Sequence, residues 1–207
     1  TWNTPSPAGA DGIPALGEKT AAAAGILSYQ IPTPEDARAL SGKHVVVVGN
    51  GASAKTAITQ LVRIARRDPS TQITWVLRRG VVGNTFGGGA ADELPERGAL
   101  GQLAEKYVAD GLADLVTGFR VTEVNRDGDR GILIAEDGRS LAPSDQIIVL
   151  TGFRPDLSIL SEVRLDTDQR LQAPTRVATE VDPNLHSCGS IRATGAADLA
   201  HPEEALY

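Results

Sequence analysis

The pattern of apolar positions between residues 43 and 79 predicts a strand, a tight turn, a helix and a second strand. The first strand is an unbroken valine run from Val45 to Val48, which is typical of a strand buried on both faces of a parallel sheet. A short glycine-containing turn follows, and apolar residues then recur at helical spacing as far as Ala65. A second apolar run extends from Ile73 to Leu77. This order predicts an α/β fold built on a parallel sheet.

The turn has the spacing G-x-G-x-x-A, which has a mechanical meaning when it stands between a strand and a helix. Gly49 permits the tight turn, Gly51 lets the backbone approach a pyrophosphate, and Ala54 keeps the helix close to the strand. The phosphates would bind the N–H groups at the start of the helix, where the helix dipole favours negative charge. The sequence therefore predicts a dinucleotide site formed by Gly49, Asn50, Gly51, Ala52, Ser53 and Ala54.

The end of the second strand indicates which dinucleotide is bound. An acidic residue at this position accepts hydrogen bonds from the ribose of NAD, whereas arginine suits the 2′-phosphate of NADP. The sequence here reads Leu77-Arg78-Arg79-Gly80, and guanidinium groups match the geometry of a phosphate. We therefore expect Arg78 and Arg79 to bind NADP(H). The alternative is that two surface arginines simply solvate the end of a strand.

The sequence after residue 79 predicts a helix, an inserted antiparallel meander and one more buried strand that completes the sheet. A glycine-rich loop from Gly80 to Gly89 follows the second strand; it either covers the cofactor, with Asn84 and Thr85 as donors, or is a flexible connector. A helix is expected over 99–110 and an antiparallel meander over 115–138. A buried strand, Gln146 to Leu150, comes last. The predicted class is a Rossmann-like α/β fold: a parallel sheet with helices on both faces and an antiparallel β-meander insertion.

We expect the nucleotide-binding domain to occupy residues 43–155, between a lead-in over 1–42 and an irregular tail over 156–207. The lead-in is rich in proline and glycine, as in turns and extended segments, although 34–40 has the pattern of a short capped helix. Residues 21–27 fit either a helical turn or the approach to a strand. In the tail, His186 and Cys188 form a weak second-site candidate, but the histidines and the cysteine lack the spacing of a zinc site, so no metal is expected.

Composition excludes several classes of protein. The 207-residue chain has a net charge of -6 and no basic run, which argues against a nucleic-acid partner. Its apolar stretches are too short to cross a bilayer, so we expect a cytoplasmic protein with no membrane partner. The one cysteine cannot form an internal disulfide or a C-x-x-C pair. Because the chain begins at Thr1 and contains no methionine, we expect a fragment or a processed product.

The order of these features resembles the NAD(P)H-binding domain of flavoproteins with two dinucleotide-binding domains, a superfamily that includes flavin-containing monooxygenases and pyridine nucleotide–disulfide oxidoreductases. Leu150-Thr151-Gly152-Phe153-Arg154-Pro155 is similar to the second Ala-Thr-Gly-type motif, where the chain of those proteins passes between the NAD(P)H and FAD domains. The pair Ser53-Ala54 is similar to the monooxygenase-like branch. The resemblance implies that Thr151 and Gly152 join the cofactor site.

The chain departs from this superfamily in three respects. The flavin-binding glycine motif and the C-terminal Gly-Asp are absent, so FAD would be held mostly by a domain outside this chain. The fingerprint F-x-G-x-x-x-H is also absent, and Tyr29 stands where its histidine is expected. A C-x-x-C dithiol is missing as well.

The resulting hypothesis is an NADPH-binding domain that passes hydride to FAD in an oxidoreductase, with the FAD-binding domain of the same protein as partner and a small molecule as substrate. No catalytic residue is assigned, and the chain alone is expected to be inactive. Two alternatives remain. A stand-alone NADP-dependent dehydrogenase would need its own proton donor, yet Tyr107 is followed four residues later by Gly111 rather than by lysine. A non-catalytic NADP-sensing module would bind the same cofactor without flavin.

Overall fold

The structure, a computed structural model, describes residues 4–80, 86, 95–169, 171–182 and 193–203. The chain divides into two compact units, one formed by residues 5–152 and the other by residues 1–4 and 153–207. Strands β1 (Thr4–Pro5) and β9 (Phe153–Arg154) lie where the chain passes from one unit to the other. Among the described residues, no helix combines the length and the apolar character needed to span a bilayer.

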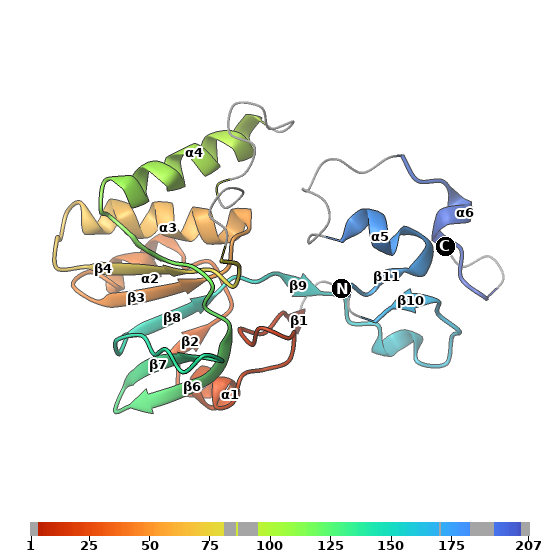
Figure 1. The fold of residues 1–207 in the computed structure, drawn as a ribbon, viewed down its shortest axis with the longest axis horizontal. Helices are drawn as coiled ribbons and strands as arrows, with labels where there is room; N and C mark the ends of the chain where they lie inside the picture. The colour runs from red at the N-terminus through yellow and green to blue at the C-terminus, as the bar shows by residue number, and fades with distance from the viewer. Residues whose placement is uncertain (1–3, 81–85, 87–94, 170, 183–192, 204–207) are drawn as a thin grey trace. The chain divides into compact units, whose positions relative to one another are not determined.

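The larger unit is built on a five-stranded parallel sheet with the strand order β2-β8-β3-β4-β5 (Figure 1). The strands are β2 (Leu27–Ser28), β8 (Gln146–Val149), β3 (His44–Val48), β4 (Gln72–Val76) and β5 (Asp114–Val116). The valine strand β3 is central: Val47 pairs with Trp75 of β4 on one side and with Ile148 of β8 on the other. Val45 to Val48 are all buried, as expected for a strand covered on both faces.

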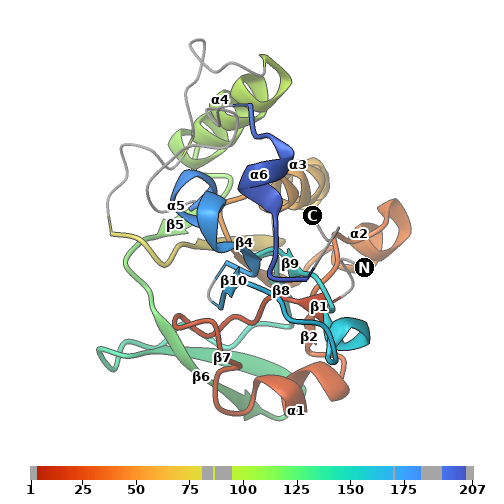
Figure 2. The same cartoon turned by 90° about the vertical axis from the view of Figure 1, so that its right-hand side faces the viewer.

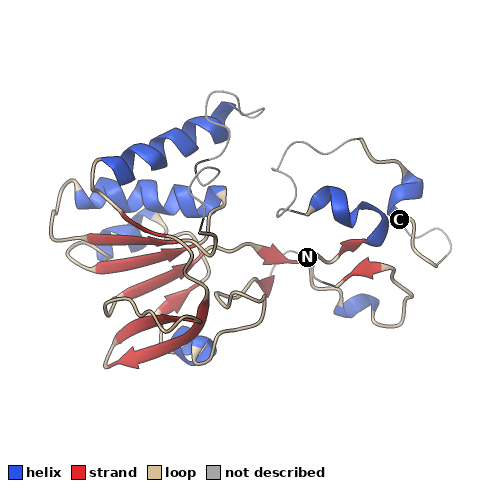
Figure 3. Ribbon diagram, viewed as in Figure 1, coloured by secondary structure: helices blue, strands red, loops and turns tan. Residues whose placement is uncertain are grey.

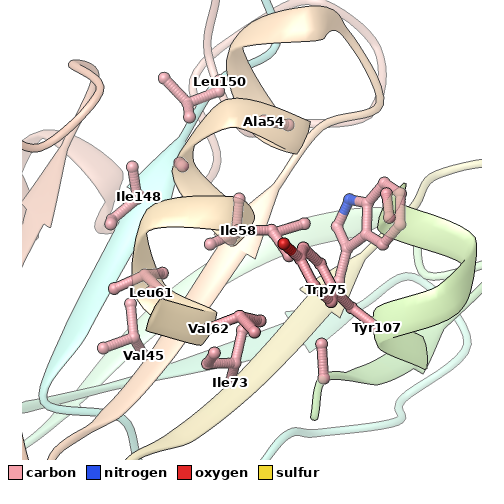
Figure 4. Packing of buried hydrophobic residues seen from close by; sticks show 14 of the residues in the cluster. Val45, Ala54, Ile58, Leu61, Val62, Ile73, Trp75, Tyr107, Ile148 and Leu150 are labelled. Carbon is pink, nitrogen blue, oxygen red and sulfur yellow. The ribbon is translucent and has the colours of Figure 1, made fainter. Parts of the chain in front are cut away.

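Three helices cover one face of the sheet: α2 (Pro34–Ala39), α3 (Ala52–Ala65) and α4 (Pro95–Ala109). The apolar stripe of α3 packs on β3 and β4, and the fully buried Ile58, Leu61 and Val62 belong to this core (Figure 4). Burial of each such side chain contributes about 1.5–3 kcal/mol relative to exposure. The predicted capped helix near 34–40 is confirmed as α2, where Thr33 and Asp36 form a reciprocal capping box.

The opposite face is covered by an antiparallel hairpin, β6 (Val121–Asp127) and β7 (Arg130–Ala135), together with helix α1 (Glu18–Ala23) (Figures 1 and 3). This second core contains Phe119, Val124, Leu133 and Ile147. The predicted fold class is therefore confirmed, including the antiparallel insertion. On this face the hairpin forms a layer beside α1. Burial alternates along β7, so the strand has one apolar face, and this face packs against the sheet.

The lead-in expected over 1–42 packs mostly within the larger unit, which begins at Pro5 rather than at residue 43. Residues 21–27 contain both expected structures, since α1 ends at Ala23 and β2 begins at Leu27 to extend the sheet at its edge. The segment 6–16, here called the strap, follows the hairpin: the Ala10 amide donates to the Val121 carbonyl over 3.0 Å. Figure 2 shows α1 beside β6 and β7.

Glu18, which the sequence reading passed over, fixes the strap from inside. Its side chain is fully buried, and its two carboxylate oxygens accept hydrogen bonds from the amides of Ala8 (2.8 Å) and Ala15 (2.7 Å) and from the Tyr29 hydroxyl (2.8 Å). A buried carboxylate is tolerated when donors surround it in this way. Without it, the buried amides of Ala8 and Ala15 would be unsatisfied at a cost of about 1–3 kcal/mol each.

The second unit contains only short elements in the residues that the structure describes. The strands β10 (Thr167–Asp168) and β11 (Ala173–Pro174) pair antiparallel across a turn in which Gln172 has a φ of +53°. The other elements are equally short. They are two 3₁₀ turns, Ser158–Leu160 and Thr175–Val177, and two helical turns, α5 (Ala178–Val181) and α6 (Ala196–Leu199). Within this unit, an ion pair of 2.7 Å joins Arg164 Nε to Glu203 Oε1, near the end of the described chain.

Replacing Tyr29 by phenylalanine should change how stability depends on alkaline pH. Burial, and then the hydrogen bond and charge of Glu18, raise the pKa of Tyr29 above its ordinary value. Below about pH 10 the phenol is neutral in both states; at higher pH it ionises first in the unfolded chain, so the native protein loses stability. Tyr29→Phe should cost about 1–2 kcal/mol at pH 7, and this difference should shrink as pH rises above about 10. Urea unfolding at several pH values measures it, and a constant difference would contradict the assignment.

Candidate functional site

The glycine turn lies where the ends of two neighbouring strands come closest. Gly49 has a φ of +128°, and a Cβ atom there would overlap the carbonyl oxygen of Leu150 and lie 2.7 Å from its carbonyl carbon. The same atom would be 3.3 Å from the amide nitrogen of Thr151. Only glycine fits this position without displacing the backbone after β8. The tight turn that the sequence predicts is thus also a contact between β3 and β8.

Trp75 holds the same turn from the β4 side. Its indole nitrogen donates a hydrogen bond of 2.7 Å to the Gly49 carbonyl, and its side chain is completely buried. Phe86 packs against the indole edge-on, with the ring centroids 5.9 Å apart. The sequence reading did not include Trp75 in the site, although a tryptophan in a strand beside the glycine turn was a usable signal, since a buried indole N–H needs an acceptor.

The N-terminus of α3 is open to solvent. Gly51 is the N-cap with a φ of -71°, and a Cβ there would meet no atom within 4 Å. In this described part of the chain no side chain caps the helix and its first turn carries no acidic residue. Residues 50–53 are exposed, whereas Ala54 is fully buried against the sheet. Unpaired amides and the helix dipole make such a terminus suited to an anion.

The sheet topology places this turn where the direction of strand order reverses. From β3 the chain continues to β4 and then β5 on one side, while β8 and β2 lie on the other side. Ligands of open α/β sheets bind in the crevice outside the carboxyl ends of the strands at such a switch point. Gly49, Leu150 and Thr151 meet at this point.

Thr151 and Gly152 are held against the strap. The Thr151 hydroxyl lies 2.8 Å from the Ser6 carbonyl and 3.1 Å from the Pro7 carbonyl, both of which accept from it. The Ser6 amide donates to the Gly152 carbonyl over 2.8 Å, and Gly152 has a φ of +108°. The structure therefore brings Thr151 beside Gly49 and engages its hydroxyl with the strap.

Arg78 and Arg79 follow the end of β4. Val76 belongs to the core on the hairpin face and Leu77 to the core on the helix face, so alternation directs Arg78 toward the hairpin and Arg79 toward the helices. Arg78 Nη1 donates to the Ala10 carbonyl of the strap over 3.0 Å. Both arginines are exposed. Continued alternation would place Arg79 on the same face as α3, whereas Arg78 also forms a hydrogen bond with the strap.

Other candidates from the sequence lie outside the described residues: Asn84, Thr85, Gly87 to Gly89, His186 and Cys188. Within the part of the chain that the structure describes, no three metal-ligating side chains cluster. His201 has a structural contact, because its Nδ1 accepts a hydrogen bond of 3.1 Å from the Asp166 amide.

No family model and no curated protein matches this sequence. Solved structures do resemble it. Bacillithiol disulfide reductase Bdr from Bacillus cereus has a TM-score of 0.50 at 20% identity, over 67% of this chain and 37% of that protein. Thioredoxin reductase from Giardia duodenalis has a TM-score of 0.49 at 23% identity, over 78% of this chain and 47% of that one.

The flavoprotein disulfide reductase RclA from Escherichia coli has a TM-score of 0.46 at 12% identity, over 65% of this chain and 27% of that protein. This chain therefore corresponds to less than half the length of each of the three proteins. At the identity and TM-score of the Bacillus cereus reductase, the comparison shows a shared fold.

The two glycines of the turn should respond differently to alanine. Gly49→Ala should destabilise the protein by about 3 kcal/mol or more, because its Cβ would overlap the Leu150 carbonyl in a left-handed backbone conformation. Gly51→Ala is the matched control: its Cβ enters open space at a negative φ, and we expect a cost below about 1 kcal/mol. Chemical unfolding of both variants makes the comparison, and equal losses of stability would refute the close contact.

Proposed function

We propose that this chain is the NADPH-binding part of a flavin-dependent oxidoreductase, in which hydride passes from NADPH to FAD held largely outside the chain. One observation carries the proposal. The glycine turn is pressed against the end of β8 at the switch point of the sheet, and it presents the uncapped N-terminus of α3 to solvent. Backbone amides and a helix dipole at this position suit a pyrophosphate.

The residues of the chain would bind and orient the dinucleotide, while the cofactors supply the redox chemistry. The pyrophosphate would lie on the amides of residues 51–54, where Gly51 leaves room for it. Arg79, on the same face as α3, is the primary ligand for the 2′-phosphate, and Arg78 supports it from the hairpin face. Thr151 borders the site through its contact with Gly49, and Gly152 follows it directly in the chain.

The flavin part of the proposal is supported by where the chain leaves the larger unit. The boundary after Gly152 falls within the motif Leu150 to Pro155, which resembles the point where flavoproteins with two dinucleotide-binding domains pass between their NAD(P)H and FAD domains. A second passage lies between Thr4 and Pro5. The fold shared with bacillithiol disulfide reductase fits this family of oxidoreductases. The oxidised substrate is proposed to be a small molecule. The Ser53-Ala54 pair resembles the monooxygenase-like branch, whose F-x-G-x-x-x-H fingerprint this sequence lacks.

A stand-alone dehydrogenase is less well supported. Its proton donor would have to be accessible, yet Tyr107 is only 4% exposed and its ring packs under the Arg66 guanidinium, 5.5 Å away. An NADP-sensing module would share the same binding geometry. It differs from the proposed oxidoreductase in that the whole protein would carry no flavin.

The nucleotide part is tested by cofactor preference. The chain should bind NADP⁺ more tightly than NAD⁺, and Arg79→Ala should weaken NADP⁺ binding by about tenfold or more, since charge-assisted bonds contribute about 1.5–3 kcal/mol. Arg78→Ala should have a smaller effect. Arg63→Ala is the control, because it removes the same charge near the far end of α3. Titration calorimetry with both dinucleotides measures the preference; a double variant of Arg78 and Arg79 that discriminates like the wild type would remove the phosphate assignment.

The flavin part is tested on the protein made from its natural full-length gene. Its visible spectrum should show a flavin band that bleaches when NADPH is added without air, because hydride transfer reduces the flavin. A colourless protein that still binds NADPH would overturn the flavoenzyme assignment and favour the sensor or the dehydrogenase.

A further inference from the structure

A third arginine from a distant part of the sequence reaches the strand end that carries Arg78 and Arg79. Arg139 follows the turn after β7, and its Nη2 donates a hydrogen bond to the Gly118 carbonyl. Its Nε donates to Asp137 Oδ2 over 2.8 Å, and the guanidinium carbon lies 5.5 Å from the centre of the Phe119 ring. Two hydrogen bonds and a cation–π contact therefore hold this guanidinium in one place.

Two glycines bring Arg139 to the backbone of Arg79. The Gly118 amide donates to the Arg79 carbonyl over 2.8 Å. A Cβ atom on Gly118 would lie 3.5 Å from the Cα of Gly80 and 3.9 Å from Nη2 of Arg139, and Gly118 has a φ of +62°. The close approach of these two segments, one after β4 and one after β5, places Arg139 at the edge where the parallel strands end.

The charge environment distinguishes Arg139 from its neighbour Arg120. Arg120 is engaged by two carboxylates, with Nε–Oε1 of Glu136 at 2.6 Å and Nη2–Oδ1 of Asp11 at 2.8 Å. Arg139 pairs with Asp137 in an ion pair whose side chains are each about half exposed, and such surface pairs contribute about 1 kcal/mol or less. Its two hydrogen bonds use two of the roughly five N–H groups of a guanidinium.

We propose that Arg139 is a third cation of the dinucleotide site and, with Arg78 and Arg79, determines the preference for a 2′-phosphate. This inference rests on the proposed function. Although the chain has a net charge of -6, Arg78, Arg79 and Arg139 all lie at or beside the ends of β4 and β5, where their positive charge would attract a dianion. The bonds to Gly118 and Asp137 restrain the guanidinium beforehand, which lowers the entropy lost on binding.

The test uses two probes that differ only in this phosphate, adenosine 2′,5′-bisphosphate and 5′-AMP. Arg139→Ala should weaken binding of the bisphosphate about fivefold or more and leave AMP binding unchanged. Arg126→Ala is the matched control, because it removes an exposed arginine from the same hairpin, where its Nη2 contacts the Gly128 carbonyl. Arg139→Lys retains the charge and should recover part of the bisphosphate affinity. Calorimetry gives the dissociation constants, and a thermal melt verifies that each variant is folded.

If Arg139→Ala binds both probes as Arg126→Ala does, or if it weakens both equally, Arg139 does not bind the 2′-phosphate and the inference is wrong. The proposed function still stands in that case, provided that Arg79→Ala loses the preference for NADP⁺ over NAD⁺. If the wild-type chain binds neither probe, the proposed function itself fails. Should Arg139→Ala prove unfolded, Arg139→Gln takes its place, because it removes the charge and keeps a long polar side chain. Bisphosphate affinity equal to that of Arg126→Ala would then overturn the inference.

Discussion

The contact between Gly49 and the backbone of Leu150 and Thr151 is the constraint on which the site depends. It lets the end of β8 lie directly against the turn after β3, with no side chain between them. The Trp75 indole holds the Gly49 carbonyl from the other neighbouring strand. Three strands thereby converge on one turn, and the direction in which α3 leaves it is fixed. The exposed helix terminus owes its position to this arrangement.

The layer on the hairpin face has a different role, because it determines where charged groups at the edge of the sheet lie. Glu18 gathers Ala8, Ala15 and Tyr29 around one buried carboxylate and so defines the course of the strap. The strap then supplies the carbonyl that binds Arg78. Phe119 provides the surface over which Arg139 is held. Burying an ionised group is costly unless it is fully hydrogen-bonded, so this network tolerates few rearrangements.

The fold and the chemistry are separate conclusions. Similarity to bacillithiol disulfide reductase at 20% identity establishes the architecture, and many reactions use the same architecture. The proposed NADPH site depends instead on particular features: a helix with no side-chain cap, a turn in which Gly49 and Gly51 carry no side chain, and arginines at the strand ends. The proposed transfer to flavin depends on the passage of the chain after Gly152.

The sequence alone determined the elements whose signals are local. The valine run, the glycine turn and the periodic face of α3 are read within about 20 residues, and the hairpin turns follow from Asp-Gly pairs at 127–128 and 137–138. The short strand β5 has three residues and was not predicted, since so brief a run has no distinguishing period. Tertiary structure decided the rest. The donors to Glu18 include Ala8 and Tyr29, ten and eleven residues away, and Arg139 lies 21 residues from the carbonyl it binds. Such contacts depend on how layers pack, and packing is set by the shape of the whole core rather than by any local pattern.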